Sequence, residues 1–186
     1  SLYGSEIIAN QMFSNENGGI AFEIRAHFVN PVEGIVGGLF FYNLKSGTIH
    51  GEIDVELLSN QLYAIQTNVY ADEPLGEGNP QIYPITNSLL NDHIYRVEWF
   101  KDAVRWFVDG ELLREETTHI PLEPMALHLN IWAPDAEWID AYHSDLTYVS
   151  NAENNTSYYF DVDSVRVTQL SSTYYYDETP TLIVST

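Results

Sequence analysis

Acidic and aliphatic residues alternate along the segment Gly51–Glu56. In a β-strand successive side chains point to opposite faces, so Glu52, Asp54 and Glu56 are expected on one face and the intervening aliphatic residues on the other. Like charges in one row repel each other and add nothing to the stability of a strand. The pattern therefore indicates a function for these acids.

Retaining glycoside hydrolysis is a reaction that uses such acids. It needs a carboxylate nucleophile and a carboxylic acid about 5–5.5 Å apart. In a strand the Cα atoms of Glu52 and Glu56 are roughly 13 Å apart, so their long side chains must lean toward each other over Asp54. The alternative is a solvated acidic strand face. The neighbouring apolar segment Gly37–Tyr42, joined through a turn-rich link, favours acids embedded in a sheet beside aromatic residues.

Short alternating segments separated by Gly, Asn, Asp and Pro recur along the chain, and no helical period is evident. Asp109-Gly110 predicts a type I′ hairpin, and residues 93–115 read as a three-stranded meander. We therefore predict an all-β fold, a β-sandwich or jelly roll of two stacked antiparallel sheets.

The composition limits the partners of the protein. The chain has 186 residues, no cysteine, 7 basic and 27 acidic residues, and a formal net charge of −20. Phosphate contacts need Lys and Arg, so nucleic acid and anionic membranes are poor partners. No apolar run approaches the length of a membrane span. We expect one domain over residues 1–186, a monomer, with no signal peptide in this chain.

Five segments in the same order along the chain resemble motifs of glycoside hydrolase family 16, the jelly-roll β-glucanases. These segments are Gly19–Arg25, Gly51–Leu58, Tyr95–Glu111, His128–Trp132 and Asp161–Val167. The resemblance implies a concanavalin A-like jelly roll that is shorter than usual at its N-terminus. It also implies an extracellular protein whose partner is a polysaccharide.

The resemblance assigns roles to the three acids. Glu52 matches the nucleophile, and Glu56 matches the general acid that later acts as base. Asp54 lies between them and is expected to hold Glu52 by a hydrogen bond. No residue is inserted between Asp54 and Glu56, which resembles the licheninases and favours a β-1,3-1,4-glucan as substrate, with β-1,3-glucan next.

Four further residues match positions that line the family's sugar-binding face: Asn68, Tyr70, Asn130 and Trp132. Sugars stack on aromatic rings and hydrogen-bond to amides, which suits these residue types. His50, two residues before Glu52, is expected on the face of the acids, where it would lower the pKa of Glu52 or bind a sugar hydroxyl.

The resemblance also implies a structural calcium at Asp163 and no cofactor for catalysis. Two other functions remain open: a transglycosylase that uses the same residues, and a lectin-like jelly roll that binds carbohydrate without cleaving it. The second alternative rests on the short N-terminus and on Asn10 and Met12, which stand where the family has a Glu and an Arg that bind substrate.

Overall fold

The regular structure of the described residues is entirely β-strand. The computed structural model describes residues 4–45, 47, 49–74, 78–147, 153 and 155–171. Its strands are β1 (Ser5–Phe13), β2 (Gly19–Val29), β3 (Val36–Leu44), β4 (Ile49–Leu58), β5 (Ala64–Pro74), β6 (Gln81–Pro84), β7 (His93–Trp99), β8 (Val104–Val108), β9 (Glu111–Glu116), β10 (Met125–Trp132) and β11 (Tyr159–Leu170). Within these ranges no helix is long and apolar enough to cross a membrane.

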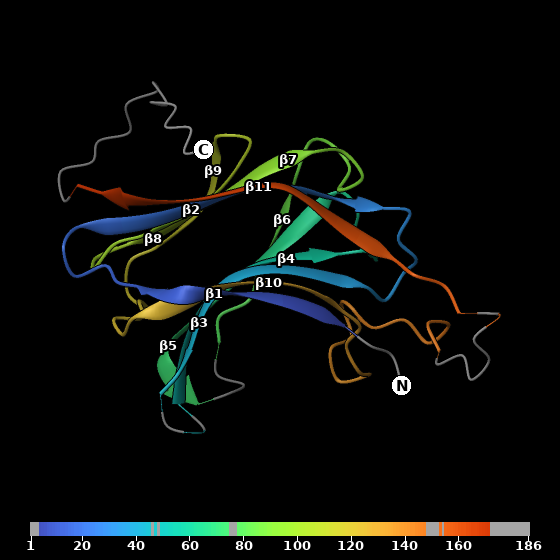
Figure 1. The fold of residues 1–186 in the computed structure, drawn as a ribbon, viewed down its shortest axis with the longest axis horizontal. Helices are drawn as coiled ribbons and strands as arrows, with labels where there is room; N and C mark the ends of the chain where they lie inside the picture. The colour runs from blue at the N-terminus through green and yellow to red at the C-terminus, as the bar shows by residue number, and fades with distance from the viewer. Residues whose placement is uncertain are drawn as a thin grey trace.

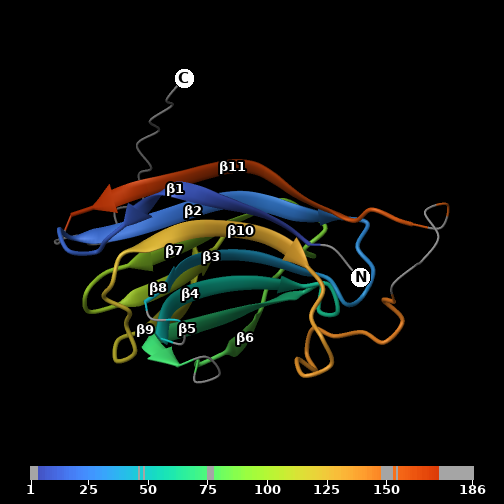
Figure 2. The ribbon, with the colours of Figure 1, turned by 60° about the horizontal axis from the view of Figure 1, so that its bottom comes forward.

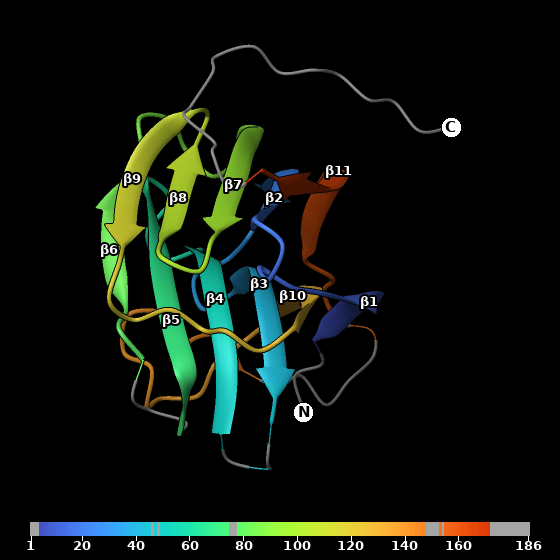
Figure 3. The same ribbon diagram turned by 90° about the vertical axis from the view of Figure 1, so that its left-hand side faces the viewer.

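The strands form two stacked antiparallel sheets (Figure 1). The six-stranded sheet has the order β1-β10-β3-β4-β5-β6, and the five-stranded sheet has the order β11-β2-β7-β8-β9. Figure 3 shows the two layers from the end, with β4 near the middle of the six-stranded sheet. The predicted β-sandwich of two antiparallel sheets is confirmed.

The predicted meander is present as β7, β8 and β9, which pair in sequence order. Asp109 and Gly110 join the last two strands with φ angles of 52° and 85°. Positive φ at both central residues defines a type I′ turn, whose twist matches that of the flanking strands. The Asp-Gly pair therefore forms the hairpin that the sequence predicts.

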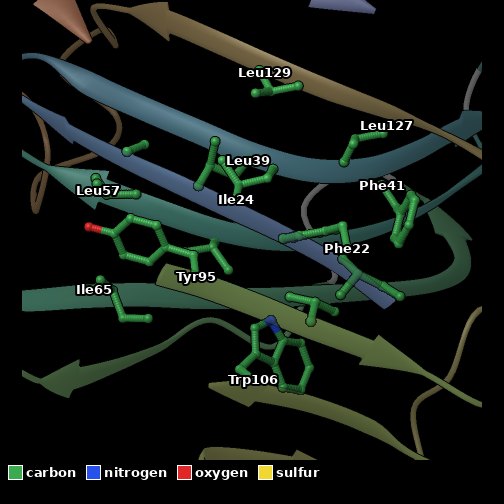
Figure 4. Packing of buried hydrophobic residues seen from close by; sticks show 14 of the residues in the cluster. Phe22, Ile24, Leu39, Phe41, Leu57, Ile65, Tyr95, Trp106, Leu127 and Leu129 are labelled. Carbon is green, nitrogen blue, oxygen red and sulfur yellow. The ribbon is translucent and has the colours of Figure 1, made fainter. Parts of the chain in front are cut away.

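The core lies between the sheets and takes one face of each central strand (Figure 4). The ring of Phe41 in β3 lies 5.2 Å from that of Phe22 in β2 and 5.6 Å from that of Trp99 in β7, so aromatic contacts cross from one sheet to the other. Leu57 is fully buried in this core beside the acids of its own strand. Its replacement by alanine is expected to cost about 2–5 kcal/mol.

Candidate active site

Strand β4 carries the acids on the outer face of the six-stranded sheet, which is the face turned away from the core. The aliphatic residues that alternate with them belong to the core and are at most 1% exposed: Ile53, Val55 and Leu57. Because side chains alternate along a strand, Glu52, Asp54 and Glu56 share the opposite face. The strand lies between β3 and β5 (Figure 2). Residues of these two strands therefore flank the acids on both sides.

Strand β4 is regular where it carries the acids. Its pairing with β3 is uninterrupted, and its pairing with β5 runs without a shift from Glu52 to Glu56. The one irregularity of this ladder lies on β5, where an extra residue separates Tyr70 from Glu73 and Asp72 has a φ of 57°. The two-residue spacing of the acids is therefore undistorted.

A hydrogen bond from the other sheet holds the middle of β4. The indole Nε1 of Trp106, in β8, donates to the backbone carbonyl of Asp54 at 2.8 Å. Trp106 is fully buried, and the guanidinium of Arg114 lies 4.6 Å from its ring centroid. The opposite sheet thus fixes the position of β4 relative to the core.

The three carboxyl groups bind protons more tightly than ordinary carboxyls do. Burial raises the pKa of Glu52 to about 7, although a hydrogen bond with Asp54 works in the opposite direction. Burial, followed by the charges on Glu52 and Glu56, raises the pKa of Asp54 well above its usual value. Burial and the charge on Glu52 raise the pKa of Glu56 to about 8. At neutral pH Glu56 therefore keeps its proton while Glu52 titrates, which suits an acid beside a nucleophile.

His50 lies at one end of this row and is completely buried. Its ring is 4.3 Å from that of Tyr70 and 5.7 Å from that of Tyr42. Nε2 lies 3.0 Å from Oε2 of Glu52, and Nδ1 lies 3.1 Å from the backbone oxygen of Glu73. Burial leaves no ring surface for a sugar hydroxyl, so that expected role does not fit the geometry. The expected lowering of the Glu52 pKa by His50 stays a prediction.

Asn68 and Tyr70 flank the acids from β5. They pair with Asp54 and Glu52, respectively, and are partly exposed. A hydrogen bond joins the two side chains, and the chain at Gly78 packs on both of them. A Cβ atom on Gly78 would lie 2.5 Å from the Tyr70 ring and 2.8 Å from the Asn68 amide oxygen, so this segment needs glycine. Their expected contact with substrate stays a prediction.

Asn130 approaches the acids from the side of β3 and β10. Its Oδ1 accepts a hydrogen bond of 3.1 Å from the backbone N–H of Gly38, and Gly38 pairs with Glu56. A Cβ atom on Gly38 would lie only 2.4 Å from that Oδ1. The missing side chain therefore lets the Asn130 amide lie beside the position of Glu56. Its expected contact with substrate stays a prediction.

Trp132 ends β10 and is partly exposed. Its ring lies 5.7 Å from that of Trp138, and both pack against the small apolar cluster of Val36, Leu58 and Ala141. The residue pairs with Val36, beyond the level of Glu56. The Trp132 ring packs against the segment that carries Trp138 and is also partly exposed to solvent. Its expected sugar contact stays a prediction.

Sequence reasoning missed several residues on the same outer face. Phe40 and Tyr42 pair with Asp54 and Glu52 from β3, and His128 stacks on Phe40 at 5.0 Å. Glu6 of β1 faces the same ring, with Oε1 3.0 Å from Nδ1 of His128. From the sequence alone, the aromatic and aliphatic residues of β3 indicate an apolar strand. Only the register with the acids tells which of its aromatic side chains face outward.

The calcium expected at Asp163 finds no support in the described side chains. Asp163 is the extra residue of a bulge in β11, is largely exposed, and has Oδ2 3.8 Å from Nε of Arg25. The positive charge beside this carboxylate is therefore the Arg25 guanidinium. Among the described residues no group of three His, Cys, Asp or Glu side chains is arranged to hold a metal. Calcium binding stays a prediction.

A sandwich of two antiparallel sheets with a row of one buried and two partly exposed acids on one outer face defines a jelly roll of the glycosidase type. The chain belongs to glycosyl hydrolases family 16, whose model matches residues 4–150. The resemblance inferred from its motifs is confirmed.

Individual relatives agree with this assignment. A β-glucanase of Bacillus licheniformis is 34% identical over 115 residues, which are 59% of this chain and 46% of that protein. The chain spans about half the length of the curated relatives it matches.

Solved structures give the same result. A Bacillus licheniformis β-glucanase structure superimposes with a TM-score of 0.71 and 28% identity, covering 89% of this chain and 71% of that chain. A β-1,3-1,4-glucanase (lichenase) derived from a mouse hindgut metagenome gives a TM-score of 0.62 and 30% identity, covering 74% and 63%.

Proposed function

We propose that this chain is the catalytic part of a retaining endo-β-glucanase that cleaves a β-1,3-1,4-glucan, with β-1,3-glucan as the next candidate. The row of acids on a regular strand carries the proposal, because it supplies a nucleophile and a protonated acid on one face. The similarity to β-glucanases and to a lichenase supports the choice of substrate.

In the proposed first step a carboxylate oxygen of Glu52 attacks the anomeric carbon and forms a glycosyl ester. The bond from that carbon to the leaving oxygen breaks, and Glu56 gives this oxygen its proton. In the second step Glu56, now ionised, takes a proton from water as the water displaces Glu52. Two inversions at one carbon return the starting β configuration.

The setting of the enzyme follows from its substrate. A polysaccharide is too large to enter a cell intact, so we propose that the protein acts outside the cell. We also propose that it works as a monomer, because the row of acids is complete within one chain.

The test is the release of reducing ends from barley mixed-linkage glucan, laminarin, xyloglucan and agarose. We expect the highest rate on mixed-linkage glucan and a first-formed product with the β configuration by NMR. Glu52→Gln, an almost isosteric change that removes the nucleophile, should lower kcat by several orders of magnitude and leave the fold intact. An α product, or activity within tenfold of the parent, would reject Glu52 as the nucleophile.

Other outcomes would identify the alternatives. Longer oligosaccharides formed from an added acceptor, in place of reducing ends, would indicate a transglycosylase. Retention of the protein on immobilised glucan, without cleavage of any substrate, would indicate a binding module.

A further inference from the structure

The tautomer of His50 follows from its hydrogen bond to Glu73. The backbone carbonyl of Glu73 can only accept, so the Nδ1 atom 3.1 Å away must carry a hydrogen. In a neutral imidazole the other nitrogen, Nε2, then has a lone pair and no hydrogen. Nε2 therefore faces Glu52 either as an acceptor or, in the imidazolium, as a second donor.

A proton is required between His50 and Glu52. Nε2 lies at ion-pairing distance, 3.0 Å, from Oε2 of Glu52, although the orientation of the two groups is not that of a hydrogen bond. No other partner for Nε2 occurs in the part of the chain that the structure describes. Without a proton, the buried lone pair of Nε2 would lie against a largely buried carboxylate, and the lone pair would not be compensated for the loss of water.

We propose that His50 is a positioning residue that shares one proton with Glu52, across Nε2 and Oε2, and holds this proton on Nε2 whenever Glu52 is ionised for attack, which fixes the orientation of the nucleophile. The inference rests on the proposed function, since it assigns Glu52 the role of nucleophile. His50 itself does not touch the sugar, because its ring is completely buried.

The groups packed around His50 leave Glu52 as its ionic partner. Tyr42 from β3 and Tyr70 from β5 cover the ring, and burial raises the pKa of both hydroxyls, so they stay neutral. Burial lowers the pKa of His50, while the backbone carbonyl and the negative charge of Glu73 act in the opposite direction. The Glu73 carboxylate Oε1 itself lies 2.7 Å from Nε2 of His119.

Farther along the strand lies Asp54. Burial, before any other cause, raises its pKa well above the usual value, so this carboxyl competes weakly for a positive partner.

The proton stays on His50 through both chemical steps. When one oxygen of Glu52 bonds to the anomeric carbon, the other oxygen becomes the carbonyl of the ester and loses most of its charge. The Nε2–H group then stabilises the carboxylate that re-forms as water displaces it. No proton is gained or lost at His50, and the proton for the leaving oxygen comes from Glu56.

Nitrogen-detected NMR of the imidazole groups tests the inference without any substrate. The chain has six histidines, and the signal that disappears in His50→Gln identifies His50. We expect Nδ1 to carry a hydrogen at all pH values. We also expect Nε2 to lose its proton at a pH about one unit higher in the parent than in Glu52→Gln, because an opposite charge at this distance favours the imidazolium.

Two results would overturn the inference: a hydrogen on Nε2 with none on Nδ1, or the same titration in the parent and in Glu52→Gln. The first is read from the parent alone, so the inference stays testable even if the variant does not fold.

The pH profile of glucan cleavage gives a second readout. His50→Gln keeps an N–H donor but cannot carry a charge, so the acid limb of kcat/KM should move to higher pH by about one unit. His27→Gln, a matched control in the five-stranded sheet whose Nδ1 lies 2.8 Å from Asp92, should leave the limb in place. A uniform loss of activity without a shift would contradict the inference. If the parent cleaves no glucan, the proposed function fails while the NMR result still decides the role of His50.

Discussion

Trp106 of the five-stranded sheet donates its indole hydrogen to the backbone carbonyl of Asp54, the middle acid of β4, at 2.8 Å. The bond is buried and runs from one sheet to the other, so it ties the position of the acids to the packing of the core. The position of the acids and the stability of the fold therefore depend on one shared contact.

Trp106→Phe should lower both stability and turnover. A buried carbonyl that loses a donor costs about 1–3 kcal/mol of unfolding free energy, measured by denaturant titration. Small displacements of catalytic groups are expensive, so kcat should also fall, by about tenfold. Trp99→Phe is the matched control, because it removes a similar buried bond of 2.8 Å to the Pro121 carbonyl. Equal kcat values for the two variants would show that the Trp106 bond does not position the acids.

Glu56→Ala should give an enzyme that an added anion rescues. An activated aryl β-glycoside needs little help from an acid, so the glycosyl ester still forms, but water attacks it slowly without a base. Azide needs no base, and it should restore turnover and yield a β-glycosyl azide, identified by NMR. An α-azide would imply a single displacement and would contradict the role of Glu52.

Gly38→Ala should weaken substrate binding. The added Cβ would lie 2.4 Å from Oδ1 of Asn130 and displace this amide from its place beside Glu56. The loss of one sugar hydrogen bond worth about 1.4 kcal/mol corresponds to about a tenfold rise in KM. Gly37→Ala is the control, because its Cβ meets the Phe160 ring at 3.3 Å instead. An unchanged KM in Gly38→Ala would remove Asn130 from the substrate site.

Stability should be highest in mildly acidic solution. The folded-state pKa values of Glu52 and Glu56, about 7 and about 8, lie above the ordinary value of 4.5. Between about pH 4.5 and 8 the folded protein holds more protons than the unfolded chain, so the free energy of unfolding falls as the pH rises.

Glu116 behaves in the opposite way. Partial burial favours its neutral form, but hydrogen bonds from Thr118, from the His119 backbone and from Arg114 outweigh this and lower its pKa to about 2. Its contribution to stability is therefore lost as the pH falls from 4.5 toward 2. Denaturant titrations should place the maximum near pH 4–5, and Glu56→Gln should flatten only the alkaline side. A maximum at pH 7–8 would contradict the burial of the acids.

The sequence predicts the strands better than it predicts their register. Alternation in β4 and the Asp-Gly turn specify local structure, because each depends on side chains a few residues apart. The contacts of His50 depend on an extra residue in β5, and the approach of Asn130 depends on a glycine in β3. These contacts form only when the strands pair, so a pattern within one short segment of the sequence does not predict them. Gly38 inside a strand was the one available signal, since a glycine there often marks a close approach.

The extra residue of β5 separates the two ends of that strand. Tyr70 and Glu73 are three residues apart, yet they pair with Glu52 and His50, which share one face, because Asp72 adopts a left-handed backbone between them. The extra residue interrupts the alternation of side chains along β5. The face on which Glu73 lies is therefore set by its pairing with His50 and not by its distance from Tyr70 in the sequence. A change of register on the Glu73 side of the extra residue can therefore leave the pairs that Tyr70 and Asn68 make with the acids in place.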